Sequence, residues 1–353
     1  MKTGRSLNEL ANEITRQADA KKDYKVATRA VSMVLGPEET PQLQLGDTSP
    51  LGITSLTHNQ IGDYTGVPRK YYEKMQEEMP SLLATNVNAW MRKAADTRLV
   101  RTLDGKARAF LSDRYRPLDN YDLASVALEK LQKTDCKVMS CELTETRLYI
   151  KAVTERITSE VKVGDIVQAG IVISNSEVGL GAIKIEPLLY RLSCKNGMIA
   201  NDFGMRRHHV GRAGGELTGD GYEIFLRDAT READDRAFWM KVGDVIAGSL
   251  DQVKFAQIVG KMTAATQDVI TNPLQVMEVT QKRFNLTDVE KAGVLTHLVN
   301  GGDLSRYGLL NAVTRYSQDV GDYDKATDFE RLGGTILELP KADWKVFTEE
   351  VKN

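Results

Sequence analysis

A period-two pattern in the middle of the chain predicts antiparallel β-hairpins. Val138, Ser140 and Glu142 alternate with Met139, Cys141 and Leu143, and the residues at 148, 150 and 152 alternate with those at 149, 151 and 153. The intervening Thr144–Thr146 segment is rich in residues that favour turns. We therefore predict two strands joined by a short turn.

A second pair of strands is expected at residues 165–174 and 182–194, with residues 175–181 as the connecting loop. Pro187 has no backbone donor, which predicts an edge position or a bulge for the second strand of this pair. Asn196 followed by Gly197 predicts a tight turn, because a type I′ turn requires positive φ at both central residues.

Helical periodicity dominates both ends of the chain. Residues 6–20 carry apolar side chains on one helical face after a capping Ser6, and residues 24–46 are expected to be extended. Residues 56–75 predict two helices joined at Gly66, an outline that resembles a helix-turn-helix. Its second helix carries only one Arg-Lys pair, so a structural helical hairpin is the favoured interpretation.

After residue 230 the pattern is helical, with a capping box at Thr287 and Glu290. The sequence therefore predicts an α+β fold, with an antiparallel β-sheet in the middle of the chain. Its parts are expected to be a helical and extended lobe at 1–90, a β-rich core at 91–229 and a helical region at 230–353.

Composition limits the class of protein. The 353 residues are 41% hydrophobic and 27% charged, with no apolar run long enough to cross a membrane. The N-terminal segment is polar and lacks the apolar core of a secretory signal. Three cysteines without C-x-x-C spacing favour a reducing compartment. We expect a cytoplasmic protein that makes no membrane contact.

Positive charge is concentrated in two segments, although the net formal charge is −2. Residues 92–116 contain eight basic and three acidic residues, and residues 184–212 contain six basic and two acidic residues. These basic islands flank the predicted hairpins, so we expect them to line one anion-binding groove. The alternative is that the arginines pair with carboxylates, and Asp113 and Asp119 stand close enough in sequence to do so.

An arginine guanidinium can donate two parallel hydrogen bonds to a phosphate, and tyrosine rings among the cations can stack on bases. The residues expected to contact a polynucleotide are Arg92, Lys93, Arg98, Arg101, Arg108, Arg114, Tyr115, Arg116, Lys184, Tyr190, Arg191, Lys195, Asn196, Arg206, Arg207, His208, His209 and Arg212.

Catalytic signatures are weak. Cys194 could act as a nucleophile with His208 or His209 as the base, and the two histidines could hold a metal together with Asp202. A buried structural cysteine and an anion-contacting histidine pair are the simpler interpretations. The chain carries no Walker A, H-E-x-x-H or G-x-S-x-G pattern, so we expect no cofactor and no metal.

Several sequence blocks resemble the phage/plasmid-like proteins of domain-of-unknown-function family 932. They are NVNAWM followed by RLVRTLDGKARAFLSDRYRPLDN, then GIVISNSEVGLGAIKIEPLLYRLSCKNGMI, and RYGLLNAVTRYSQDV followed by DFERLGG. The resemblance runs from about Leu56 to Gly334 and implies a protein of a bacteriophage, prophage or conjugative plasmid. The resemblance identifies no catalytic residue in this chain, because the family's activity is unknown.

We expect a nucleic-acid-binding protein of phage or plasmid replication or recombination that binds and anneals single-stranded DNA as a ring or filament of identical copies. The predicted sheet and helices are similar in outline to Rad52-type annealing proteins. One alternative is a metal-dependent nuclease or nucleotide hydrolase that uses His208 and His209. The other is an accessory protein that binds a host protein. The missing signatures favour a binding protein over an enzyme.

Overall fold

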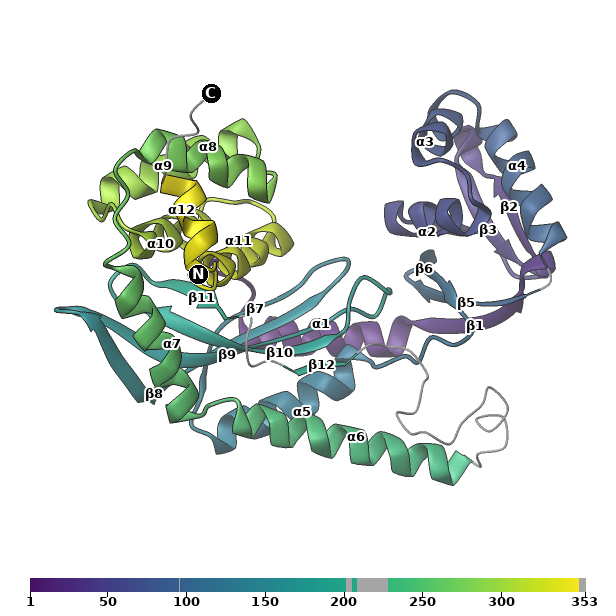
Figure 1. The fold of residues 1–353 in the computed structure, drawn as a ribbon. Coiled ribbons are helices and arrows are strands. Elements are labelled where there is room, and N and C mark those ends of the chain that lie inside the picture. Colours follow the sequence, from purple (N-terminus) through teal and green to yellow (C-terminus); the bar gives the residue numbers. More distant parts are fainter. Residues whose placement is uncertain (95, 201–204, 208–227, 349–353) are drawn as a thin grey trace.

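The computed structural model describes residues 1–94, 96–200, 205–207 and 228–348. These residues form an α+β fold with two β-sheets, as the alternating and helical patterns predict (Figure 1). The first sheet lies in an N-terminal lobe. The second sheet lies between helices of the C-terminal half on one side and α5 and α6 on the other.

The first sheet has the strand order β1-β5-β6-β4-β3-β2, and all its neighbours are antiparallel except β4 and β6. Its strands are β1 (Lys22–Ala27), β2 (Val31–Leu35), β3 (Pro41–Leu45), β4 (Leu51–Ile53), β5 (Thr97–Leu103) and β6 (Lys106–Ser112). Short 3-10 turns stand at Thr28–Ala30 and Pro37–Glu39. A separate apolar core joins this sheet to α2 (Ser55–Thr65), α3 (Arg69–Glu78) and α4 (Pro80–Lys93).

The second sheet has the order β11-β10-β9-β8-β7, with β12 also paired to β10. Its strands are β7 (Lys137–Leu143), β8 (Leu148–Lys162), β9 (Asp165–Asn175), β10 (Ile183–Arg191), β11 (Asn196–Ile199) and β12 (Met205–Arg207). The predicted hairpins are therefore confirmed.

Helices cover the second sheet from both sides. One apolar core contains side chains of α1 (Leu7–Ala20), α5 (Asn120–Lys133) and α6 (Asp228–Gly248). A larger core is formed with α7 (Gln252–Ala265), α8 (Pro273–Phe284), α9 (Asp288–Gly301), α10 (Arg306–Tyr316), α11 (Tyr323–Leu337) and α12 (Lys341–Thr348). Capping boxes at Ser6 and Thr287 start α1 and α9, as their sequences predict. No helix in the described ranges combines the length and apolar character needed to cross a bilayer.

The predicted boundary at residue 91 does not separate the two sheets. β5 and β6 follow that boundary, yet they complete the first sheet by pairing with β1 and β4. In the opposite direction, α1 precedes the first sheet but packs against the second through Leu10 and Ile14. Strand partners distant in sequence decide this arrangement, and the local pattern carries no information on them.

Of two local predictions around β10 and β11, that of a turn at Asn196–Gly197 is wrong. Pro187 lies in an interior strand, but it pairs in register with β9 alone, between the segments of β10 that pair with β12 and β11, so its missing backbone donor interrupts no strand pairing. The Asn196–Gly197 pair belongs to β11, and the turn stands earlier, at 192–195, where Lys195 has a φ of 52°. The Asn196 amide donates to the Thr314 hydroxyl at 2.6 Å, so a buried tertiary contact overrides the turn preference.

Candidate nucleic-acid interface

Two arginines of the first basic island are internal. Arg101 of β5 is fully buried and donates to Asp23 at 2.9 Å and to Asp119 at 2.7 Å. Arg108 of β6 is also buried and pairs with Glu177. The prediction that Arg101 and Arg108 contact a polynucleotide is therefore wrong, because each guanidinium already neutralises carboxylates inside the protein.

These arginines join the first sheet to the loop that follows β9. Arg101 donates from its third nitrogen, Nη1, to the Glu177 carbonyl at 3.1 Å. The Glu177 carboxylate also accepts from the backbone N–H of Asn120 at 2.6 Å, which ties the start of α5 to the same loop. Arg101 and Lys21 together hold the pKa of Asp119 below its usual value despite burial. The alternative that Asp119 pairs with arginine is confirmed.

Other predicted contact residues are also occupied or buried. Arg116 pairs with Asp234 and Asp235 of α6, and Arg191 pairs with Asp165 at 2.5 Å. The Tyr115 hydroxyl donates to the Ser176 carbonyl at 3.1 Å. Tyr190 is only 7% exposed and belongs to a small apolar core, and Asn196 is buried. Stacking of bases on Tyr190 and contact with Asn196 are therefore excluded in this conformation.

Part of the second island lies on paired strands. Lys184 lies on β10 opposite Arg206 of β12, and Arg207 follows on that strand. Lys195 is exposed in the turn before β11, and its carbonyl accepts from the N-terminal ammonium. His208, His209 and Arg212 lie outside the described residues, as does Asp202. Figure 1 places α4 and β11 in different lobes, so the parts of the two islands on these two elements do not meet.

Four other cations of the first island, Arg92, Lys93, Arg98 and Arg114, lie toward the same end of the first sheet. Helix α4 ends with Arg92 and Lys93, and β5 starts nearby at Thr97. Arg98 pairs in register with Ser112, and a turn from Ser112 to Tyr115 places Arg114 next to it. Arg29 reaches the same end, because the N–H of the preceding Thr28 donates to the Asp96 carbonyl at 2.9 Å.

Aromatic rings accompany these cations. Trp90 is 45% exposed, and the Lys93 ammonium lies 5.1 Å from the centroid of its ring. The Arg98 guanidinium lies 4.0 Å from the ring centroid of Tyr64, a residue of α2. We call this set the basic-aromatic surface: Arg29, Tyr64, Trp90, Arg92, Lys93, Arg98 and Arg114. The sequence prediction missed Arg29, Tyr64 and Trp90, although Trp90 stands directly before the Met-Arg-Lys segment.

Charge on the basic-aromatic surface is only partly compensated. Arg98 has Asp96 at 3.8 Å, and the Tyr64 hydroxyl donates to Asp96 at 2.5 Å. That hydrogen bond holds the pKa of Asp96 below its usual value, while burial raises the pKa of Tyr64. Within the ranges that the structure describes, Arg29, Arg92, Lys93 and Arg114 form no ion pair. Among the described residues, the surface therefore has four cations without an ion-pair partner and one exposed indole.

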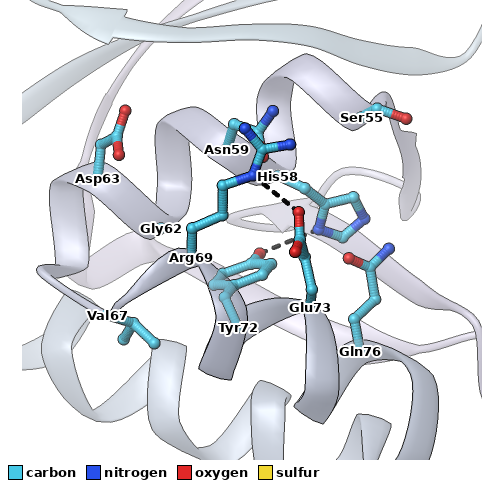
Figure 2. A pocket seen from close by; sticks show the side chains of 10 residues that line it. All are labelled: Ser55, His58, Asn59, Gly62, Asp63, Val67, Arg69, Tyr72, Glu73 and Gln76. Carbon is cyan, nitrogen blue, oxygen red and sulfur yellow. Dashed lines mark hydrogen bonds and ion pairs between the residues drawn. The ribbon is translucent and has the colours of Figure 1, made fainter. Parts of the chain in front are cut away.

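A cavity of about 370 Å³ opens between α2 and α3 (Figure 2). His58 and Tyr72 form its buried part, and the His58 Nδ1 and the Tyr72 hydroxyl are 2.9 Å apart. Burial lowers the pKa of His58 to about 4, so its imidazole is neutral at physiological pH. Arg69 and Glu73 form an ion pair of 2.8 Å at the rim.

Comparison with protein families gives a match to Domain of unknown function (DUF932) over residues 108–332. This segment covers more than half of the chain. The chain belongs to the DUF932 family. No curated protein and no solved structure matches it.

The DUF932 segment contains the buried Arg108–Glu177 pair and the whole second sheet. Most of the basic-aromatic surface and the α2–α3 cavity precede it in the chain. Among the described residues of this DUF932 protein, no group of His, Cys, Asp and Glu side chains is placed to hold a metal ion.

Proposed function

We propose that this DUF932 protein binds single-stranded nucleic acid through the basic-aromatic surface. The observation that carries the proposal is an exposed Trp90 whose ring lies 5.1 Å from the Lys93 ammonium, next to Arg92 at the end of α4. An exposed indole gives a base a stacking platform, and the neighbouring cations attract the phosphates. Because every base has a π-face, binding of this kind tolerates many sequences.

Exposed cations at one end of a β-sheet are suited to binding a flexible single-stranded nucleic acid. Arg92 and Lys93 stand at the C-terminal end of α4, so they also neutralise the negative end of the helix dipole. A single-stranded nucleic acid that displaces water around Trp90 gains base stacking on the indole. Its binding also releases counterions from several of its phosphates. The chain as a whole has a formal charge of −2, so binding should stay local to this surface.

The four cations of the basic-aromatic surface that have no ion-pair partner among the described residues can contact only a few phosphates of a single-stranded nucleic acid. Several copies in a ring or filament would present repeated surfaces to one strand, and avidity would then raise the affinity. We therefore propose that the protein acts as a homo-oligomer, in the annealing of single-stranded DNA during phage or plasmid recombination. Its place of action would be the cytoplasm of a bacterial host.

The experiment is fluorescence anisotropy with a labelled single-stranded thymidine oligonucleotide at low salt. We expect binding by the wild-type protein and a loss of about tenfold for Trp90→Ala, since stacking contributes about 1–3 kcal/mol per base. A matched control is Lys133→Ala with Arg156→Ala, two exposed cations that are distant from α4 and already paired with acidic residues. Wild-type affinity in the Trp90 variant, or no anisotropy change at all, would contradict the proposal.

A further inference from the structure

A small pocket lies at the end of the second sheet where β9 ends and β10 begins. Its volume is about 20 Å³, which is room for one small ion or one water molecule. Three cationic side chains and a serine are part of its lining: Arg147, Lys184, Arg331 and Ser174. Among the described residues, no carboxylate lines the pocket. Three cationic side chains around so small a space indicate an anion as the occupant.

Strand register brings these groups to one face of the sheet. Ser174 of β9 stands opposite Lys184 of β10 and opposite Tyr149 of β8. Residues directly opposite each other in antiparallel strands direct their side chains to the same face. Arg331 reaches this face from α11, because its guanidinium pairs at 2.8 Å with Glu186, which stands two residues after Lys184 on β10. The pocket therefore lies between the end of the second sheet and α11.

The positive charge at the pocket is only partly neutralised. Arg331 pairs with Glu186 and, at 3.4 Å, with Asp328. Arg147 donates at 2.7 Å to a backbone carbonyl of the loop after β9, and it forms no ion pair with any residue that the structure describes. The charge of Arg147 is therefore left at the pocket, whatever groups Lys184 contacts.

Two buried hydroxyl groups on this face lack an acceptor. Ser174 is 3% exposed and lines the pocket, and its hydroxyl forms no hydrogen bond with the described residues. The hydroxyl of the neighbouring Tyr149 is buried and also has no hydrogen-bond partner among them. Burial and the nearby Asp324 raise the pKa of Tyr149, so this hydroxyl stays protonated and can donate. Since buried donors generally require an acceptor, both groups favour an occupant that accepts hydrogen bonds.

We propose that this pocket binds a single small inorganic anion of the halide class, such as chloride. Its volume of about 20 Å³ leaves no room for a phosphate group or a nucleoside, and its cationic lining disfavours a metal ion. A bound anion would accept from the Ser174 hydroxyl and neutralise Arg147, and so connect the start of β8 with the end of β9. The site is separate from the basic-aromatic surface and does not depend on the proposed strand binding.

The first experiment is crystallography of the full chain grown in sodium bromide, because bromide replaces chloride and its anomalous scattering locates it. We expect an anomalous peak between the side chains of Arg147 and Ser174 in the wild-type protein and no peak there in Arg147→Gln. A pocket of the wild-type protein that holds only water would overturn the inference.

The second experiment measures thermal unfolding while sodium chloride replaces sodium gluconate at constant ionic strength, so that screening of surface charges stays equal. We expect the wild-type Tm to rise by about 2 °C when chloride reaches about ten times its dissociation constant. The rise should be lost in Arg147→Gln and in Ser174→Ala, and the serine variant keeps the test decisive if the arginine variant fails to fold.

Arg156→Gln is the matched control, because Arg156 lies on β8, is 68% exposed and pairs with Asp135 away from the pocket. It should keep the chloride-dependent rise of the wild-type protein. A rise that persists in both pocket variants would overturn the inference, since it would assign the anion to another site. Absence of any rise in the wild-type protein would overturn it as well.

Discussion

The guanidinium of Arg108 and the carboxylate of Glu177 form a buried ion pair between the first sheet and the loop after β9. Their side chains are only 8% and 6% exposed. The partners are 69 residues apart in the chain, so the pair joins segments that local sequence does not connect. A cation that the sequence assigns to ligand binding is here part of the joint between the two sheets.

Removing one partner of this pair should destabilise the protein strongly. In Arg108→Ala the Glu177 carboxylate stays buried without its guanidinium, so we expect the free energy of unfolding to fall by about 3–5 kcal/mol. Urea denaturation measures this change. Arg114→Ala is the control, because its exposed side chain has no such partner and its loss should change stability by less than about 0.5 kcal/mol. Similar changes in both variants would show that the Arg108–Glu177 pair is not a structural joint.

Two helical glycines should respond to alanine in opposite directions. A Cβ on Gly334 of α11 would stand 2.0 Å from the Ile199 carbonyl oxygen, so Gly334→Ala should push α11 off β11 and cost about 1–3 kcal/mol. A Cβ on the exposed Gly260 of α7 would meet nothing within 4 Å, so Gly260→Ala should stabilise by about 0.5–1 kcal/mol. Thermal unfolding should therefore shift down for Gly334→Ala and up for Gly260→Ala. A stabilising Gly334→Ala would contradict the packing of α11.

His58 should make stability fall with acidity. Burial lowers the pKa of folded His58 to about 4, whereas an unfolded histidine has a pKa of about 6.5. The unfolded state therefore binds more protons between these values, and folding loses about 2 kcal/mol from this group between about pH 7 and about pH 4.5. The His58 contribution to the free energy of unfolding is fully lost at pH values below the pKa of the folded protein's His58. It is fully present at pH values well above the pKa of unfolded histidine.

The measurement is urea denaturation at both pH values for wild type and His58→Gln. Carboxylates contribute equally to both proteins, so the difference between the two pH dependences isolates His58. An identical pH dependence in wild type and His58→Gln would show that His58 is not held neutral.

Much of the fold follows from local sequence. Alternation in residues 138–153 and helical periodicity after residue 230 predict the hairpins and helices, because burial of one face imposes these periods. The same patterns do not specify which strands pair with one another, so they do not predict that β5 and β6 complete the first sheet. Asn196–Gly197 was assigned to a turn, since its buried bond to Thr314 depends on a helix more than a hundred residues away.

The candidate site was harder to predict than the fold. A count of charges along the chain locates the first basic island. It does not reveal that Asp23, a partner of Arg101, and Asp234, a partner of Arg116, lie 78 and 118 residues away. Such pairing occupies four of the predicted arginines: Arg101, Arg108, Arg116 and Arg191. Trp90 was not predicted, because base stacking was assigned only to the tyrosines that stand among the cations.

The slope of log affinity against log salt for a single-stranded oligonucleotide tests the central claim most directly. We predict that the wild-type protein loses affinity steeply as salt rises, and that Arg92→Ala with Arg114→Ala flattens the slope by about 1.4, or about 0.7 for each lost phosphate contact. The paired-cation control Lys133→Ala with Arg156→Ala should retain the wild-type slope. A slope unchanged by the loss of Arg92 and Arg114 would contradict binding at the basic-aromatic surface.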